Sequence, residues 1–191
     1  MPTHTIMIEP NVALASFAGR AAPGRAPRRL LCIEPLTPWS GVADFLTGLA
    51  DWAECNPDPP IEMRWLGAGP LRPVLAAQPL PPGLTQQFAG PPDPAALAIA
   101  FAECHILVVP SLLATCNPHV SDALDAGLRV IGSVRCEAAR SRLDAPHAGW
   151  LFDPLRPGAV IQVLNRVFPS AAARPARPFA ARRGMASMAA E

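Results

Sequence analysis

The chain alternates short apolar runs with amphipathic stretches over most of its length. Runs rich in aliphatic and β-branched residues, bounded by turn residues, predict strands at 30–33, 61–66, 84–89, 105–109, 128–133 and 150–152. Between these runs, apolar residues recur at spacings of three and four, which is typical of helices with one buried face. The helices predicted in this way cover 41–54, 71–77, 95–103, 118–126, 135–142 and 157–168.

Regular alternation of strand and helix is typical of a parallel sheet covered by helices on both faces. We therefore predict an α/β, doubly wound (Rossmann-like) fold with a parallel sheet of five to six strands. Its centre is expected to hold Val108, Val109, Val130 and Ile131. The predicted organisation is an opening segment and linker at 1–29, one domain at 30–168 and an Ala/Pro/Arg-rich tail at 169–191. The composition of the tail predicts disorder.

The segment 105–133 reads as strand, loop, helix and strand. Asn117-Pro118 supplies an N-cap residue followed by proline at the first helical position, and Gly127 ends the helix. A helix that starts at the carboxyl end of a parallel strand presents unpaired N–H groups to that edge of the sheet. Such a helix start suits an anion, for example a phosphate.

Composition narrows the class of protein. Half of the residues are apolar and the net charge is +1, which argues against a general nucleic-acid binder. The chain has no lysine, so all 16 basic residues are arginine. Its five cysteines form no Cys-x-x-Cys pair, which favours unpaired thiols in a reducing cytoplasm over a disulfide framework or a zinc site. The sequence predicts neither a secretory signal nor a membrane-spanning helix.

Four features follow one another with the spacing of a known family: Pro110-Ser111, Asp122-Ala123, Gly127 and Val130-Ile131. In this register the chain resembles the C-terminal, donor-binding domain of GT-B glycosyltransferases of the group 1 or family 4 type. That resemblance implies a single GT-B half domain and a nucleoside diphosphate sugar as donor substrate. It also implies catalysis without a metal or other cofactor. The acceptor would be held by an N-terminal domain that this chain lacks.

The resemblance also implies a donor-binding site. A Gly-x-Gly-Pro follows the second strand in the family, a glycine loop near the nucleotide base follows the third, and an acidic residue on the later helix holds the ribose. The expected donor-binding residues are Gly67, Gly69, Pro70, Gly90, Ser111, Asn117 and Asp122, with no catalytic or metal-binding residue assigned. Two alternatives stay open: a simple tight turn at 67–69, and a solvent-facing carboxylate at Asp122. Arg72 stands where a dinucleotide fingerprint needs its third glycine, which excludes a nicotinamide or flavin site.

The chain departs from the family at the positions that contact the phosphates and the sugar. Pro35 and Ser40 stand where the family has the arginine and lysine that clamp the donor diphosphate, and Ala114 replaces its first glutamate. Each lost charge-assisted contact costs roughly 1.5–3 kcal/mol, so two would weaken donor binding about 10²–10⁴-fold. We expect either an enzyme half that works with a separately encoded acceptor domain, or a catalytically dead binding module or truncated product. For the arginine-containing tail, a solvated segment is favoured over weak contact with a membrane surface.

Overall fold

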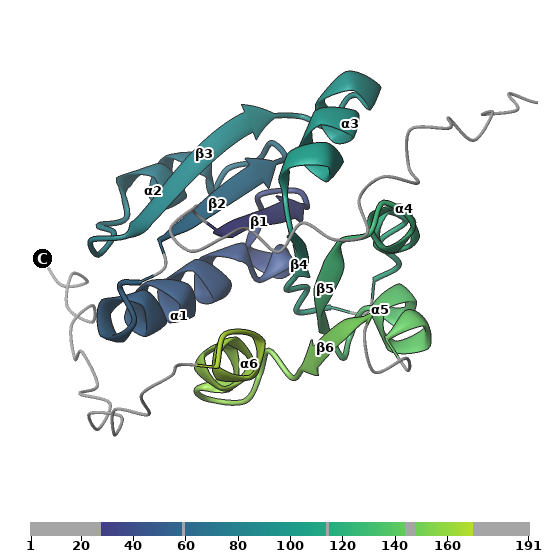
Figure 1. The fold of residues 1–191 in the computed structure, drawn as a ribbon. Coiled ribbons are helices and arrows are strands. Elements are labelled where there is room, and N and C mark those ends of the chain that lie inside the picture. The colour runs from purple at the N-terminus through teal and green to yellow at the C-terminus, as the bar shows by residue number, and fades with distance from the viewer. Residues whose placement is uncertain (1–27, 59, 114, 144–147, 170–191) are drawn as a thin grey trace, which may run out of the picture.

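The computed structural model describes residues 28–58, 60–113, 115–143 and 148–169. These residues form a sheet of six parallel strands in the order β3-β2-β1-β4-β5-β6 (Figure 1). This confirms the predicted doubly wound fold. The strands are β1 (Arg28–Ile33), β2 (Ile61–Leu66), β3 (Leu84–Gly90), β4 (Ile106–Val109), β5 (Arg129–Ser133) and β6 (Gly149–Phe152). The predictions for 1–27, Ala114 and the tail from 170 onward lie outside the described residues.

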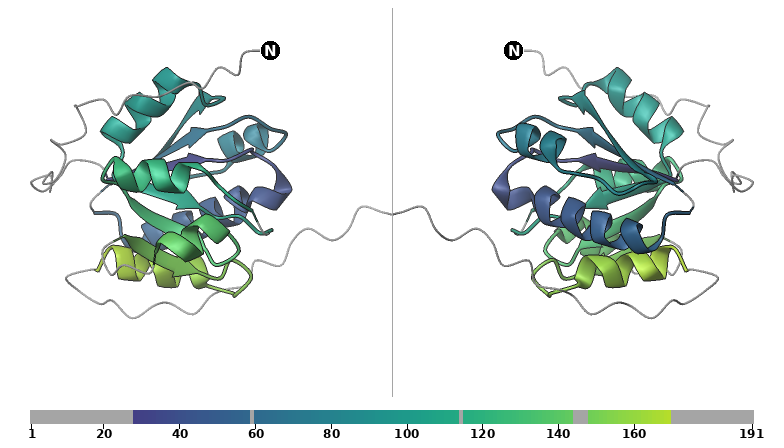
Figure 2. Two further views of the ribbon diagram at one scale, coloured as in Figure 1. Left: turned by 90° about the vertical axis from the view of Figure 1, so that its right-hand side faces the viewer. Right: turned by 90° about the vertical axis from the view of Figure 1, so that its left-hand side faces the viewer.

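Within the described ranges, six helices connect and cover the strands, with a short 3-10 turn (Pro38–Ser40) before the first of them. In the turned views of Figure 2, helices lie on both sides of the sheet. The helices are α1 (Val42–Cys55), α2 (Arg72–Ala77), α3 (Pro94–Glu103), α4 (His119–Asp125), α5 (Glu137–Arg142) and α6 (Ala159–Val167). None of the helices in the described ranges is long and apolar enough to cross a membrane.

The two faces of the sheet carry separate hydrophobic clusters because side chains alternate along each strand. In β1, Leu30 and Cys32 belong to the cluster with α1, α2 and α6. Leu31 and Ile33 belong to the opposite cluster with α3, α4 and α5. Strands buried on both faces lose their polar alternation, which explains the continuous apolar runs in the sequence. Val108, Val109, Val130 and Ile131 are fully buried, as predicted.

The strand order reverses direction between β1 and β4. From β1 the chain moves outward through β2 to β3, and it then returns to place β4 on the other side of β1. Leu30 pairs with Ile106 and Cys32 with Val108 in this central register. The loops that leave β1 and β4 therefore diverge at the carboxyl edge and open a crevice between them.

Close backbone packing fixes the loops that follow β1 and β2. Gly67 lies so near Glu34 that a Cβ atom there would be 2.0 Å from the Glu34 carbonyl oxygen. A Cβ atom added at Gly69 would likewise lie 2.3 Å from the Leu36 carbonyl oxygen. The Leu36 N–H donates to the Ala68 carbonyl at 3.0 Å. The two loops thus form one tightly packed wall, which a side chain at Gly67 would disrupt.

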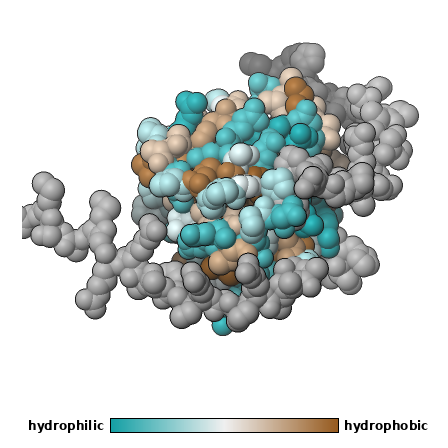
Figure 3. Space-filling view, turned by 60° about the vertical axis from the view of Figure 1, so that its left-hand side comes forward, coloured by the Kyte–Doolittle hydropathy of each residue, from teal (hydrophilic) through white to brown (hydrophobic). Residues whose placement is uncertain are grey.

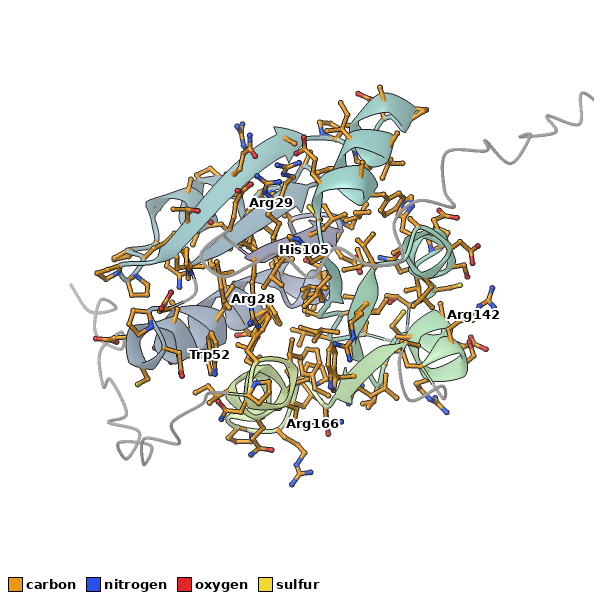
Figure 4. All side chains as sticks on the ribbon, viewed as in Figure 1. Arg28, Arg29, Trp52, His105, Arg142 and Arg166 are labelled. Carbon is orange, nitrogen blue, oxygen red and sulfur yellow. The ribbon has the colours of Figure 1, made fainter. Side chains whose placement is uncertain are left out.

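A side-chain contact joins α1 to α6. Trp52 on α1, labelled in Figure 4, donates from Nε1 to Asn165 Oδ1 on α6 at 2.8 Å. Its ring packs on Phe168, with ring centroids 5.5 Å apart. The hydrogen bond satisfies the one polar atom of a buried indole, so Trp52 can occupy the core beside α6.

The described surface is mixed in character. On the face shown in Figure 3, apolar and polar residues are interspersed. Large exposed apolar side chains come from different elements, among them Val74 on α2, Ile99 on α3 and Leu155 after β6. All five cysteines lie in the described part of the chain and are unpaired, as the sequence predicts.

Candidate functional site

A cavity of about 430 Å³ opens at the carboxyl edge of the sheet, at the switch between β1 and β4. Its walls come from the ends of β1 and β2 with the loops that follow them, from Pro92 after β3, and from the loop that precedes α4. The described lining consists of residues 33–35, 66–68, Pro92 and 115–119. Ligands of open α/β sheets bind in this crevice, so we take the cavity as the candidate site.

The acidic group of this cavity is Glu34, the first residue after β1. Its Oε1 accepts hydrogen bonds from Ser111 Oγ at 3.0 Å and from Asn117 Nδ2 at 3.1 Å. Burial raises the pKa of the Glu34 carboxyl above its ordinary value, whereas these two hydrogen bonds and the charge of His119 oppose that shift. The structure therefore holds a partly desolvated carboxylate at the mouth of the switch-point crevice.

Asn117 positions this carboxylate and also starts the following helix. Its Nδ2 donates to the Ile33 carbonyl at 3.1 Å as well as to Glu34, and its Oδ1 accepts from the His119 N–H at 2.9 Å. The side chain is only 6% exposed. The structure begins α4 at His119 with Pro118 as the N-cap, one residue later than predicted, but the Asn117 side chain still accepts from the first helical N–H, that of His119.

The expected row of free N–H groups at the start of α4 is not found. Pro118 has no N–H, and the His119 N–H is bound to the Asn117 side chain. The Val120 N–H donates to the Asn117 carbonyl at 3.4 Å. The first two N–H groups of this seven-residue helix are therefore already engaged within the chain and are not free for a phosphate.

The structure places the sequence-predicted residues in three groups. Gly67 and Asn117 line the cavity. Gly69, Gly90 and Ser111 lie behind the lining: Gly69 packs on Leu36, the Gly90 carbonyl accepts from the Gly67 N–H at 2.7 Å, and Ser111 donates to Glu34. Pro70 is exposed and lies outside the lining.

Asp122 also lies outside the lining, and its side chain is 60% exposed. Its Oδ2 is 3.4 Å from Nδ1 of His119, which does line the cavity. The carboxylate is therefore one side chain removed from the candidate site in this structure. This is the arrangement expected of a solvent-facing carboxylate near a helix start.

The two clamp positions differ in what they face. Pro35 is exposed and lines the cavity. Ser40 is 6% exposed and donates from Oγ to the Thr37 carbonyl at 2.7 Å, so it points back into its own turn. The titratable side chains of the described lining are Glu34, His119 and the thiol of Cys116. The described lining contains no arginine.

Glu34 is the residue that sequence reasoning overlooked. It occurs in the run Glu34-Pro35-Leu36, where the sequence comparison considers only the absence of the family's arginine at position 35. The available signal was its position, immediately after four buried strand residues at an edge where ligands bind. An acidic residue in that position can be solvated or held by the protein, and the three-dimensional contacts with Ser111 and Asn117 show that Glu34 is held.

A second, larger hollow of about 750 Å³ adjoins the first and shares Thr115 and Cys116 with it. Thr115 is held against the segment after β5, since its N–H donates to the Arg135 carbonyl at 3.3 Å and its carbonyl accepts from the Glu137 N–H at 3.0 Å. The other residues that line it are Arg135, Glu137, Arg140, Ser141 and Leu151. Within the described ranges, no group of three or more His, Cys, Asp or Glu side chains is arranged to hold a metal ion.

Comparison with protein-family models gives no match, and comparison with curated proteins gives none either. Solved structures do match. Sucrose-phosphate synthase from Thermosynechococcus elongatus superposes with a TM-score of 0.60 and 16% identity, over 76% of this chain and 37% of that protein. WaaG, a glycosyltransferase involved in lipopolysaccharide biosynthesis, superposes with a TM-score of 0.59 and 18% identity, over 73% of this chain and 37% of that protein. Anabaena HepE, in complex with UDP and glucose, superposes with a TM-score of 0.54 and 15% identity, over 73% of this chain and 38% of that protein.

These similar proteins include GT-B glycosyltransferases, and the chain spans a little over a third of their length. At such identities the similarity establishes the fold. The chain therefore has the fold of a single GT-B half domain, as the sequence predicts.

Proposed function

We propose that the chain is a glycosyltransferase-like domain that binds a nucleoside diphosphate sugar in the cavity between the β1, β2 and β4 loops. The observation that carries this proposal is the position of the cavity at the switch point of a 3-2-1-4-5-6 sheet, where such folds bind nucleotides. The similarity to HepE supports it, because that protein was solved with UDP and glucose. The class of reaction proposed is transfer of a glycosyl group.

Donor binding should be weak, on the order of millimolar, because the residues at the clamp positions cannot hold a diphosphate. Pro35 carries no charge, and Ser40 is turned into its own hydrogen-bonded turn. The 191 residues alone should not transfer sugar, since the resemblance places the acceptor on a second domain. That domain would come from a partner chain or from a longer polypeptide.

A second candidate is a binding module without catalysis. The observation that favours it is the carboxylate of Glu34 beside Pro35, where the resemblance places a cationic clamp. The two candidates share the ligand site and differ in turnover. A transfer assay with an added acceptor domain separates them.

Calorimetric or NMR titration with UDP, GDP, ADP and UDP-glucose tests donor binding directly. We expect saturable, weak binding of at least one of these ligands. Cys116→Trp should abolish it, because Cys116 is exposed and lines the cavity. Cys55→Trp is the matched control, since Cys55 is also exposed but ends α1 outside the lining. Binding that survives Cys116→Trp would place the site elsewhere, and no binding at all would contradict the proposed function.

A further inference from the structure

Glu34 presents one carboxylate oxygen to the protein and leaves the other uncommitted. Both donors, Ser111 Oγ and Asn117 Nδ2, bind Oε1. Among the described residues, no hydrogen bond reaches Oε2. Because Glu34 itself lines the cavity, this acceptor is available to a molecule bound there. A half-buried carboxylate gains most from such a donor, because burial has removed part of its hydration.

The rest of the described lining has no arginine to pair with a phosphate, and several of its backbone positions cannot donate to one. Three of its residues, Pro35, Pro92 and Pro118, have no backbone N–H. The Gly67 N–H donates to the Gly90 carbonyl at 2.7 Å, and the His119 N–H donates to Asn117. A phosphate in this cavity would lie beside the Glu34 carboxylate with no arginine in the described lining to offset its charge. A group that itself donates hydrogen bonds and carries no charge fits the same surroundings.

We infer that Glu34 contacts the ligand directly and that the cavity receives an uncharged, hydroxyl-bearing part of it, a ribose or a hexose, with the phosphates outside. Oε2 of Glu34 accepts from a ligand hydroxyl. Ser111 and Asn117 are positioning residues that fix the direction of the carboxylate. This inference rests on the proposed function, since it names the part of the donor that this cavity binds.

Glu34→Gln is a sharp test because the two donors fix the orientation of the new amide. Ser111 and Asn117 require an acceptor, so the amide oxygen takes the place of Oε1. The NH₂ group then replaces Oε2 and presents hydrogen atoms to the ligand hydroxyl. The fold keeps both internal bonds, whereas recognition of the ligand loses its acceptor. Asp125→Asn on α4 is the matched control, since it neutralises an exposed carboxylate outside the lining.

The experiment is an NMR titration of the full chain and both variants with UDP-glucose, uridine and glucose, with thermal melting to verify folding. We expect at least one of uridine and glucose to bind within about tenfold of UDP-glucose, and the one that binds identifies the occupant as ribose or hexose. Glu34→Gln should weaken the binding of that ligand and of UDP-glucose about tenfold, which is the loss of affinity expected for a hydrogen bond to a charged group. Asp125→Asn should leave both unchanged.

A measurement on the unsubstituted chain keeps the inference testable even if Glu34→Gln fails to fold. Inorganic pyrophosphate should not compete with UDP-glucose. Competition by pyrophosphate, or equal binding of UDP-glucose by a folded Glu34→Gln variant, would overturn the inference and leave the proposed function standing. Failure of the chain to bind any of these ligands would overturn both.

Discussion

The Ser111 hydroxyl donates to the Glu34 carboxylate at 3.0 Å, across 77 residues of sequence. Glu34 follows β1 and Ser111 follows β4, so this bond joins the two loops that diverge at the switch point. It fixes the carboxylate at the mouth of the crevice. The bond is therefore both a structural link between the two halves of the sheet and the support of the candidate site.

Removal of this donor should destabilise the protein. Ser111→Ala leaves Oε1 of a partly buried carboxylate with Asn117 as its one remaining donor, so we expect a loss of about 1–3 kcal/mol in the free energy of unfolding at pH 7. Urea denaturation measures this loss. Ser141→Ala is the control, because the Ser141 hydroxyl is exposed and bonds only to the Ala138 carbonyl, and its effect should stay within about 0.5 kcal/mol. Equal stabilities of the two variants would show that the bond contributes nothing.

The raised pKa of Glu34 predicts a pH dependence of stability with a definite sign. A carboxyl group whose pKa is higher in the folded state binds its proton more tightly there than in the unfolded chain. Its contribution to stability is present below the unfolded pKa, about 4.3, and is lost as pH rises through the folded pKa. Glu34→Gln cannot titrate, so relative to the unsubstituted chain it should gain stability with rising pH.

Denaturation of both proteins between about pH 4 and pH 7 measures this difference. Other groups also titrate in this range: burial lowers the pKa of His105, and the bond to Arg64 lowers that of Glu103. Because both proteins contain these groups, their effects cancel in the comparison. If the stability of Glu34→Gln relative to the unsubstituted chain stays constant or falls as pH rises, the assignment is contradicted.

Gly67→Ala should be strongly destabilising for a steric reason. The new Cβ atom would lie 2.0 Å from the Glu34 carbonyl oxygen, which is main chain and cannot rotate away. We expect a loss of about 2 kcal/mol or more in the free energy of unfolding. Ala68→Ser at the exposed neighbouring position is the control and should cost less than about 0.5 kcal/mol. A mild effect at Gly67 would show that the two loops pack less closely than the structure has them.

Pro35→Arg should introduce preference for phosphate. Pro35 is exposed at the cavity, so an arginine there can reach a phosphate that lies outside it. UDP affinity should rise about tenfold, a gain of about 1.4 kcal/mol, while uridine affinity stays unchanged. Ser40→Lys should add little, because Ser40 is buried and its hydroxyl is bound to Thr37. Unchanged UDP affinity in a folded Pro35→Arg variant would contradict this prediction, because it would show that the phosphates lie out of reach of position 35.

The sheet could be predicted from sequence because its signal is local. Six apolar runs separated by helical periodicity define strands and connections, and residues such as Val108 and Ile131 are buried on either face. The carboxyl-edge location of Gly67 and Asn117 follows from the same alternation. Element ends were less accurate: β1 starts at Arg28 through pairing with β2, which a local pattern does not contain.

The chemistry of the site could not be read in this way. Glu34, Ser111 and Asn117 meet only after folding, across 77 and 83 residues. Free N–H groups are expected at α4 because a proline after an asparagine marks a helix start. In the structure, however, Pro118 has no N–H to offer, and the Asn117 side chain accepts the N–H of His119. Local sequence shows where a helix begins and leaves undetermined which of its donors are already bound.

A nucleotide-sugar ligand is expected to occupy the crevice between the β1, β2 and β4 loops and to contact Glu34. Backbone amide shifts of an isotope-labelled chain, recorded during titration with UDP-glucose, test it most directly. The shifts should concentrate at 33–36, 66–69 and 115–120, and Glu34→Gln should reduce them at a fixed ligand concentration. Shifts centred instead on the neighbouring hollow around Arg135 and Arg140, or an unchanged response in Glu34→Gln, would contradict it.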